Sequence, residues 1–475
     1  GNMYEDIEKF CFFSKAVLSI LPLIGFKPDI IHCHDWQTGL IPVYLHDSFQ
    51  SDPFFWGIKT IFTIHNLKFQ GTWSVDTIKG FSGLSDYYFT SDKLEAYGNG
   101  NLLKGGLVYA DRITTVSRSY ASEIRMPFYG EGLDGLLRAR SKQLSGIVNG
   151  IDYNVYNPKT DKDIAVNYSV EDAIKAKAVN KTALQKELGL EENPDAFMLG
   201  IVSRLTDQKG LDLVECVLDQ ICAEDVQLVV LGTGEGKYQD MFTYYSRKYP
   251  ERVSANIFYS EALSHRIYAS CDAFLMPSLF EPCGLSQLMS LRYGTLPIVR
   301  ETGGLRDTVT PYNEVDGTGT GFSFTNYNAH EMLAIIRYAK KTYFNDRKAW
   351  NEMVLRAMKQ DFSWDASARE YEKLYDGLIE EEERRKEAIR LQQAREAAEA
   401  ALKEAEKALE LAKRAEEKAI RKFSGIEDEP EDEKAEISKA EEIDETPEAA
   451  PESEEVTEVL ETPEEAEETA VEEKE

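Results

Sequence analysis

Residues 197–210 read FMLGIVSRLTDQKG, an apolar run that ends in polar and cationic residues. The run at 197–203 has the length of a buried strand, and a helix-like stretch follows it. Arg204 and Lys209 therefore stand at the end of a strand. Such a pair suits a pyrophosphate, because arginine binds phosphate bidentately and lysine acts as a point charge. The alternative is a pair of solvated surface cations.

The same alternation of a short apolar run and a longer helix-like stretch continues along the chain, which is typical of an α/β protein. The runs predicted to be strands are 29–34, 59–65, 112–116, 146–150, 197–203, 227–231, 254–259, 273–276 and 296–299. A connector at 151–194, with a helix over about 170–188, separates them into two sets. We predict two Rossmann-like lobes, the first at 1–150 and the second at 195–363. Ligands should bind in a cleft between them, at the carboxyl ends of the strands.

The C-terminal part is predicted to be helical and then disordered. A crossover helix is expected over 364–379, and a helix rich in Ala, Glu and Lys over 380–423. A heptad seam there consists of Leu391, Ala394, Ala398, Ala401, Ala405, Ala408, Ala412, Ala415 and Ala419. Both a coiled coil and a solvated single helix stay open, because alanine buries little area. Residues 424–475 have the composition of a disordered acidic tail.

The net charge of the 475 residues is −30, with 54 Lys and Arg against 84 Asp and Glu. Residues 424–475 hold 24 acidic and 3 basic residues, so the rest of the chain is only mildly acidic. This balance argues against nucleic acid and anionic membranes as partners. Scattered cysteines without a CxxC pair indicate reduced thiols in a cytoplasmic protein. No apolar run reaches the roughly 18 residues that a membrane span needs.

The stretch His32-Cys33-His34-Asp35-Trp36 lies at a predicted strand end. On a strand, His32 and His34 share one face while Cys33 and Asp35 take the other. A zinc site would need further ligands, and no second cluster supplies them, so we do not predict a metal here. Asp35 and Trp36 would instead face the cleft. The alternative for Asp35 is the N-cap of a helix.

Two other strand ends carry polar groups with weaker signals. His65-Asn66 follows the strand at 59–65, where a hydrogen-bonded turn is the alternative to a functional site. The segment LGTGEGK at 231–237 resembles a phosphate loop. It lacks the first glycine and the final Ser or Thr of that motif, so we interpret it as a strand-to-helix turn.

Two segments of the second lobe complete the candidate site. Glu281 is followed by Pro282, which would hold the carboxylate rigidly near the cleft. A solvent-exposed loop carboxylate is the alternative. Gly303 and Gly304 open a predicted helix, where bare backbone amides can approach a phosphate.

Together these segments resemble bacterial glycogen synthases and plant starch synthases, the ADP-glucose-dependent glycosyltransferases of the GT-B fold. The resemblance runs in order over residues 1–378. It rests on the motifs IHCHDW (31–36), FTIHNL (62–67), LKGGL (103–107), VNGID (148–152), VSRL and QKGL (202–205, 208–211), Tyr259 with SHRI (264–267), EPCGL (281–285), TGGL (302–305) and DFSW (361–364).

The resemblance implies a role for each matching residue. Arg204 and Lys209 would hold the ADP phosphates, and Glu281 would bind and position the donor glucose. His65 and Asp35 would complete the catalytic set from the facing lobe, and Asp35 with Trp36 would line the acceptor side. The implied donor-binding residues are Asn66, Asn149, Tyr259 (stacked on adenine), Cys283, Gly284, Leu285, Thr302, Gly303 and Gly304.

The reaction implied by this resemblance is transfer of glucose from ADP-glucose to the non-reducing end of an α-1,4-glucan, with retention at the anomeric carbon. No cofactor and no metal are expected, since two fixed cations can stabilise the departing ADP. Asp161-Lys162-Asp163 is the only Asp-x-Asp triplet, and it lies in the connector. We expect the C-terminal helix and tail to be solubilising or to bind a protein partner.

Two departures from the family pattern matter. The family has a Lys-x-Gly-Gly-Leu loop on its first strand, whereas Lys104-Gly105-Gly106-Leu107 lacks the intervening residue. About a hundred family residues would precede Gly1, so these 475 residues alone are predicted to be inactive and poorly soluble. Broader GT-B relatives carry a second Glu after the first, where this chain has Leu288 and Met289, as the narrower family does.

Two alternative functions stay open. One is another GT-B glucosyltransferase that uses a UDP-sugar donor. The other is a catalytically dead protein that binds glucan or acts as a scaffold. Glycogen phosphorylase shares the architecture but uses a pyridoxal-phosphate lysine, and these motifs do not resemble that family.

Overall fold

The computed structural model describes residues 3–425, and the side chains from Glu5 onward. The chain divides into two compact units, residues 1–387 and 388–475. Both predicted lobes lie in the first unit. Most of the predicted acidic tail, residues 426–475, lies outside the described residues.

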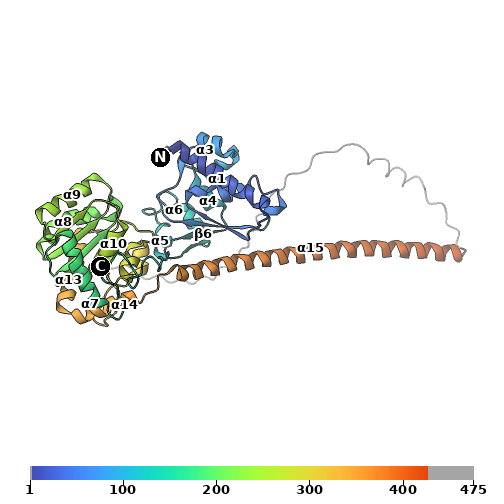
Figure 1. Cartoon of the computed structure of the whole chain (residues 1–475). Helices are drawn as coiled ribbons and strands as arrows, with labels where there is room; N and C mark the ends of the chain where they lie inside the picture. The colour runs from blue at the N-terminus through green and yellow to red at the C-terminus, as the bar shows by residue number, and fades with distance from the viewer. Residues whose placement is uncertain (1–2, 426–475) are drawn as a thin grey trace, which may run out of the picture. The chain divides into compact units, whose positions relative to one another are not determined.

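The first lobe is built on a parallel sheet, as the apolar runs predicted. Among the described residues this sheet has four strands in the order β1-β2-β6-β7 (Figure 1). Their bounds are β1 Ile30–His34, β2 Lys59–Ile64, β6 Arg112–Thr115 and β7 Leu144–Gly146. The strand predicted at 146–150 is misplaced, because β7 begins at Leu144 and ends at Gly146, so only Gly146 is shared. At Gly150 the chain passes so close to Trp364 that an added Cβ would lie 2.5 Å from that backbone.

Helices and a small antiparallel sheet surround these strands. The helices are α1 Met3–Leu23, η1 Trp36–Thr38, α2 Leu40–His46, η2 Pro53–Phe55, α3 Val75–Ser82, η3 Asp86–Tyr88, α4 Leu102–Tyr109, α5 Arg118–Glu123 and α6 Asp134–Ala139. The small sheet has the order β3-β5-β4, with bounds β3 Thr72–Ser74, β4 Glu95–Ala96 and β5 Asn99–Asn101. It was not predicted, because strands of two or three residues leave no periodic signal.

The second lobe has a doubly wound parallel sheet. Within residues 3–425 its six strands have the order β10-β9-β8-β11-β12-β13. Their bounds are β8 Phe197–Val202, β9 Val226–Leu231, β10 Val253–Asn256, β11 Ala273–Met276, β12 Leu296–Arg300 and β13 Phe322–Phe324. The chain starts at the centre, builds outward through β9 and β10, and then returns to the other side of β8. The strand order therefore reverses between β8 and β11, where open α/β sheets bind their ligands.

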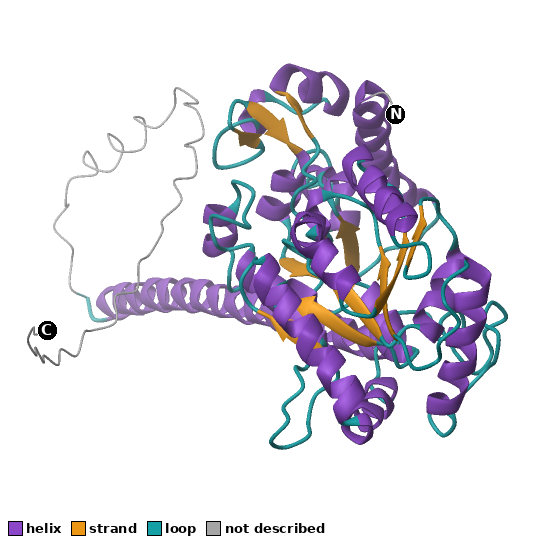
Figure 2. Ribbon diagram, turned by 90° about the vertical axis from the view of Figure 1, so that its left-hand side faces the viewer, coloured by secondary structure: helices purple, strands orange, loops and turns teal. Residues whose placement is uncertain are grey.

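Helices cover this second sheet as well (Figure 2). Apolar side chains fill the space between the helices and the strands. The helices are α7 Ala173–Leu188, η4 Asp207–Lys209, α8 Leu211–Ala223, α9 Gly236–Lys248, α10 Glu261–Ser270, α11 Ser286–Arg292, α12 Gly303–Thr308, α13 Ala329–Asn345 and α14 Arg347–Met358. The apolar core of the first lobe forms a separate cluster. The second lobe has a further, smaller apolar cluster that includes Leu184, Met198 and Ile267. Because the first lobe has an apolar core of its own, we treat the two lobes as distinct parts of one unit.

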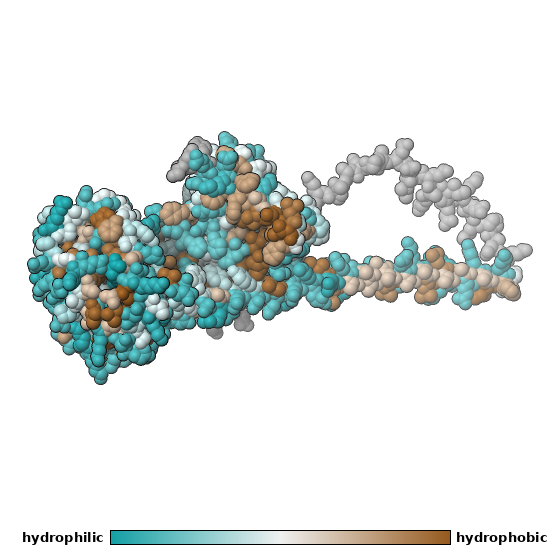
Figure 3. Space-filling model, viewed as in Figure 1, coloured by the Kyte–Doolittle hydropathy of each residue, from teal (hydrophilic) through white to brown (hydrophobic). Residues whose placement is uncertain are grey.

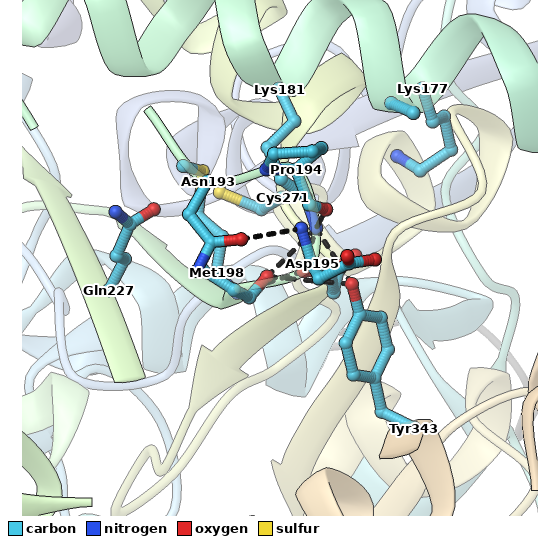
Figure 4. A network of polar contacts seen from close by, with 12 residues as sticks. Lys177, Lys181, Asn193, Pro194, Asp195, Met198, Gln227, Cys271 and Tyr343 are labelled. Carbon is cyan, nitrogen blue, oxygen red and sulfur yellow. Dashed lines mark hydrogen bonds and ion pairs between the residues drawn. The ribbon is translucent and has the colours of Figure 1, made fainter. Parts of the chain in front are cut away.

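Buried lysines fix the connector helix α7 to the second sheet. Lys181 forms an ion pair with Asp272 (Nζ–Oδ2 2.6 Å) and donates to the hydroxyl of Tyr343 (Figure 4). Lys177 donates to the carbonyls of Tyr268 and Ala269. Burial lowers the pKa of Lys177 to about 7. Lys177 and Lys181 share the single carboxylate of Asp272. Loss of the Lys177 proton would leave one cation for that carboxylate.

A single helix, α15 (Trp364–Phe423), covers both segments that were predicted as separate helices. Its first part returns to the first lobe, where Ser367 donates to the Val148 carbonyl and Glu382 pairs with Lys59 (2.9 Å). In the second unit, every described residue from 388 to 425 is exposed. Between residues 3 and 425 we find no helix that is both long and apolar enough to cross a bilayer.

Apolar side chains lie exposed on the first lobe, where Figure 3 shows them in brown. Phe12, Leu23, Ile24 and Phe26, which lie in or directly after α1, are each more than half exposed. Large apolar patches of this kind favour association and lower solubility.

Candidate functional site

The central pair of the site joins Lys209 to Glu281 across the reversal point of the second sheet. Lys209 ends η4, after β8, and Glu281 lies in the loop after β11. The Lys209 ammonium lies 2.6 Å from Oε2 of Glu281, and the Ser278 hydroxyl donates to the same oxygen at 3.1 Å. Glu281 is only 6% exposed, so the alternative of a solvated loop carboxylate is wrong. The ammonium of Lys209 and the hydroxyl of Ser278 thus fix this buried side chain in position.

Arg204 and Tyr259 lie together in a pocket of about 350 Å³. Its lining also includes Tyr156, Gly232 and Leu285. Tyr259 is 85% exposed, so its ring is available to a ligand. The volume is in the range of small-ligand sites, and an exposed aromatic ring beside a cation suits a nucleotide.

The glycines after β12 are required by a close approach of two backbone segments. Gly303 has φ +45°, and a Cβ added there would lie 2.0 Å from the Glu281 carbonyl oxygen. A Cβ on Gly304 would lie 1.9 Å from the Cys283 carbonyl oxygen. Both amides already have protein acceptors, since Gly303 donates to Glu123 and Gly304 to Glu281. The predicted phosphate contact through these amides stays a prediction.

In the first lobe, Asp35 links the ends of β1 and β2. Its Oδ1 accepts a hydrogen bond from the backbone amide of His65 at 2.8 Å. The N-cap interpretation is therefore wrong, because the carboxylate points to the neighbouring strand end rather than to η1. Burial raises the pKa of Asp35, and the bond from His65 partly offsets this effect.

The histidines of both strand ends are in contact with each other. His34 Nδ1 lies 3.1 Å from His65 Nε2, and the His32 and His34 rings stack at 4.3 Å between centroids. Burial, followed by the neighbouring His34 and His65, lowers the pKa of His32 to about 4. His32 is therefore neutral at physiological pH and bonds to Tyr375 of α15 at 2.8 Å.

Two further first-lobe candidates, Trp36 and Asn66, directly follow Asp35 and His65 in the chain. The Trp36 ring packs on Trp73 and Phe10, with centroids 5.4 and 5.1 Å apart. Asn66 turns the chain, and its side-chain oxygen accepts from the Lys68 amide. Trp36 is thus partly built into the core, and its predicted place on the acceptor side stays a prediction.

First-lobe residues contact the second lobe directly beside Glu281. The Ser117 hydroxyl donates to the Pro282 carbonyl at 2.6 Å, and the Lys68 ammonium lies 5.9 Å from the Phe280 ring centroid. A backbone hydrogen bond from Asn149 partly offsets the burial that raises the pKa of Cys283 to about 12. The structure thus brings Asn149 to Cys283, and their predicted donor-binding role stays a prediction. It also adds Ser117, which carried no recognisable sequence signal.

One group of side chains within the described residues has the spacing of metal ligands, namely Asp161, Asp163 and His265. His265 Nδ1 lies 2.7 Å from Oδ2 of Asp161, and the Tyr293 hydroxyl donates to the same oxygen. These bonds already satisfy the buried carboxylate and tie the connector to α10. The arrangement is explained by hydrogen bonding, and the prediction that the reaction needs no metal stays a prediction.

Two parallel α/β lobes that meet beside a partly buried lysine paired with a buried glutamate, and beside a nucleotide-sized pocket, define a glycosyltransferase of the GT-B class. Residues 1–139 match the family described as "Starch synthase catalytic domain", and residues 182–354 match "Glycosyl transferases group 1". Among solved structures, the catalytic domain of starch synthase IV from Arabidopsis thaliana, bound to ADP and acarbose, matches with a TM-score of 0.74. It is 35% identical and covers 79% of this chain and 78% of that one.

The chain belongs to the glycogen synthase family. The glycogen synthase of Lachnospira eligens is 69% identical over 376 residues, which cover 79% of each protein. That of Lachnoclostridium phytofermentans is 65% identical over 378 residues, 80% of this chain and 79% of the relative. The sucrose-phosphate synthase of Thermosynechococcus elongatus, at 18% identity and a TM-score of 0.51, shares the fold alone.

Proposed function

We propose that this protein is a glycogen synthase that transfers glucose from ADP-glucose to the non-reducing end of an α-1,4-glucan, with retention of configuration. The observation that carries the proposal is the Lys209–Glu281 pair at the reversal point of the second sheet. The relatives named glycogen synthase support it. So does the starch synthase IV structure with ADP bound.

On the donor side, Arg204 and Lys209 would neutralise the diphosphate, and Tyr259 would stack on adenine. Glu281 would hold the glucose, with Asn149, Cys283, Gly284, Leu285, Thr302, Gly303 and Gly304 shaping the rest of the donor site. The exposed ring of Tyr259 and the buried carboxylate of Glu281 support this division. Preorganised groups of this kind typically contribute about 10²–10³ in rate each.

On the acceptor side, we assign His65 and Asn66 to sugar contacts and Asp35 with Trp36 to the glucan. The bond between glucose C1 and the phosphate oxygen would break while the acceptor hydroxyl oxygen bonds to C1, and the hydroxyl proton would pass to the departing phosphate oxygen. ADP leaves as an anion, so the two cations stabilise it without a metal. Positive charge that develops on the sugar ring would be stabilised by nearby carboxylates.

We further propose the domain organisation that the sequence predicted. Residues 1–150 form the acceptor-side lobe, 151–194 the linker, 195–363 the nucleotide-sugar lobe and 364–379 the crossover. A cytoplasmic location fits the reduced cysteines. The helix at 380–423 and the tail are proposed to bind a protein partner or to pair as a coiled coil. Sedimentation velocity of the chain with and without residues 388–475 tests the pairing, because a coiled coil would give a dimer only when they are present.

The 475 residues hold no Lys-x-Gly-Gly-Leu sequence, and we propose that they are inactive by themselves. Exposed apolar side chains on α1 also support low solubility. The test compares glucosyl transfer from ADP-glucose to glycogen by these residues alone and by a form that carries the segment ahead of residue 1. Activity of the 475 residues alone would overturn this part of the proposal and leave the assignment of the reaction intact.

A further inference from the structure

A short helix in each lobe accepts hydrogen bonds from the other lobe. The carboxylate of Glu123 in α5 accepts from the Gly303 amide (2.9 Å) and from the Thr302 hydroxyl (3.1 Å). In return, Asp307 of α12 accepts from the amide and the hydroxyl of Ser119, at 2.9 and 2.5 Å. We call these five residues the carboxylate clasp (Figure 1 shows α5 beside the second lobe).

Glu123 is not placed where its own helix would favour it. It is the last residue of α5, and a negative charge at the C-terminal end of a helix is unfavourable. Burial also raises the pKa of Glu123, which the bond from Gly303 partly offsets. The helix-end charge and the burial of the carboxylate are both unfavourable for the first lobe. The two hydrogen bonds that Glu123 accepts come from Thr302 and Gly303 of the second lobe. The hydrogen bonds from Thr302 and Gly303 of the second lobe therefore explain the position of this carboxylate.

The clasp reaches Glu281 through two backbone contacts. The Gly304 amide donates to the Glu281 carbonyl at 3.0 Å, and the close approach at Gly303 leaves no space between the two segments. The hydroxyl of Ser117, the N-cap residue of α5, donates to the Pro282 carbonyl. The Glu281 loop is thus held between the α12 segment and the first lobe. Loss of the Glu123 contacts would remove the hydrogen bonds to Thr302 and Gly303 and leave the Ser119–Asp307 pair as the remaining part of the clasp.

We propose that Glu123 is a positioning residue, which keeps the Glu281 loop in register with the first-lobe residues His65 and Asp35. The inference rests on the proposed function of Glu281, but the geometry of the clasp does not. Glu123 would contact neither donor nor acceptor. Its contribution would be to keep the buried carboxylate of Glu281 oriented toward the sugar and beside the Lys209 ammonium.

The structural test compares Glu123→Ala with Glu123→Gln in the 475-residue chain. The glutamine keeps an oxygen that accepts from Gly303 and Thr302, whereas the alanine does not. We expect amide hydrogen exchange over residues 278–285 and 302–305 to be about tenfold faster in the alanine variant and close to wild type in the glutamine variant. Glu215→Ala, on the exposed face of α8, is the matched control. Equal exchange in Glu123→Ala and wild type, or equal exchange in both Glu123 variants, would overturn the proposal.

The functional test separates positioning from general destabilisation. In a form that carries a Lys-x-Gly-Gly-Leu segment, Glu123→Ala should lower kcat about tenfold and change KM for ADP-glucose less than about threefold. Glu123→Gln should restore kcat. An unchanged kcat would contradict the positioning role. If the wild-type form neither binds ADP nor transfers glucose, the proposed function fails, while the exchange result still decides whether the clasp holds the loop.

Discussion

Lys209 and Glu281 are 72 residues apart in sequence, yet Nζ of Lys209 lies 2.6 Å from Oε2 of Glu281. Each follows a strand that borders the reversal point, β8 for Lys209 and β11 for Glu281. The pair is therefore a consequence of doubly wound topology. It also places a cation and a carboxylate where such sheets bind ligands.

The first prediction concerns Lys209. Lys209→Ala removes the cation and leaves the Glu281 carboxylate buried without it. In a form that carries a Lys-x-Gly-Gly-Leu segment, glucosyl transfer should fall about 10²–10³-fold. Steady-state assays with ADP-glucose measure this loss. Lys175→Ala, on the exposed face of α7, should behave like wild type, and near-normal turnover of Lys209→Ala would defeat the assignment.

The second prediction concerns base recognition by Tyr259. Stacking of a base on an aromatic ring contributes about 1–3 kcal/mol, so Tyr259→Ala should weaken ADP binding about tenfold or more. Tyr259→Phe keeps the ring and should keep the affinity. Isothermal titration with ADP measures both, and Tyr244→Ala, another exposed ring of the second lobe, is the control. Equal ADP affinity of Tyr259→Ala and wild type would show that Tyr259 does not contribute to ADP binding.

The third prediction concerns Gly303. A methyl group at Gly303 meets the Glu281 carbonyl oxygen, and φ there disfavours any side chain. Gly303→Ala should lower the free energy of unfolding by about 1–3 kcal/mol and displace the Glu281 loop. Gly236→Ala, where an added Cβ has open space, is the matched control and should be neutral. Thermal unfolding of both variants tests this, and equal melting temperatures would show that the segments can separate at no cost.

The fourth prediction is a pH dependence of stability due to Lys177. Its pKa is about 7 in the folded chain and about 10.4 when unfolded, so between these values the unfolded state binds more protons. Burial of Lys177 therefore lowers the free energy of unfolding by its full amount below about pH 7, and this destabilisation disappears as pH rises toward 10. Lys177→Met should remove that rise, which amounts to about 1–3 kcal/mol between pH 6.5 and 9.

Urea unfolding at both pH values measures the difference between Lys177→Met and wild type. The methionine also removes the hydrogen bonds from Lys177 to Tyr268, Ala269 and Thr295, but that cost does not depend on pH. Lys175→Met, on the exposed side of the same helix, controls for the loss of a surface charge. A parallel pH dependence in Lys177→Met and wild type would show that Lys177 stays charged in the folded protein.

Much of the fold was predictable because its strands are buried on both faces. Runs such as Phe197–Val202 and Ala273–Met276 are continuous apolar segments, and they begin and end close to where the composition changes. β13 and the small sheet β3-β5-β4 were missed because they are only two or three residues long. Their pairing depends on tertiary contacts rather than on a local pattern.

The sequence pointed to the residues of the candidate site, but it did not show most of the contacts between them. Arg204, Lys209 and Glu281 stand out because charges directly follow apolar strands. Glu123 and Asp307 carry no such signal, since a carboxylate on a short helix is usually solvated. Their partners are about 180 residues away in sequence, at Gly303 and Ser119. Only the packing of one lobe on the other reveals them.

Transfer of labelled glucose to glycogen tests the central claim most directly. ADP-glucose and UDP-glucose are compared as donors, in a form that carries a Lys-x-Gly-Gly-Leu segment ahead of residue 1. We expect incorporation from ADP-glucose, a strong preference for it over UDP-glucose, and loss of incorporation in Lys209→Ala. Glucan binding without transfer from ADP-glucose, or a preference for UDP-glucose, would contradict it.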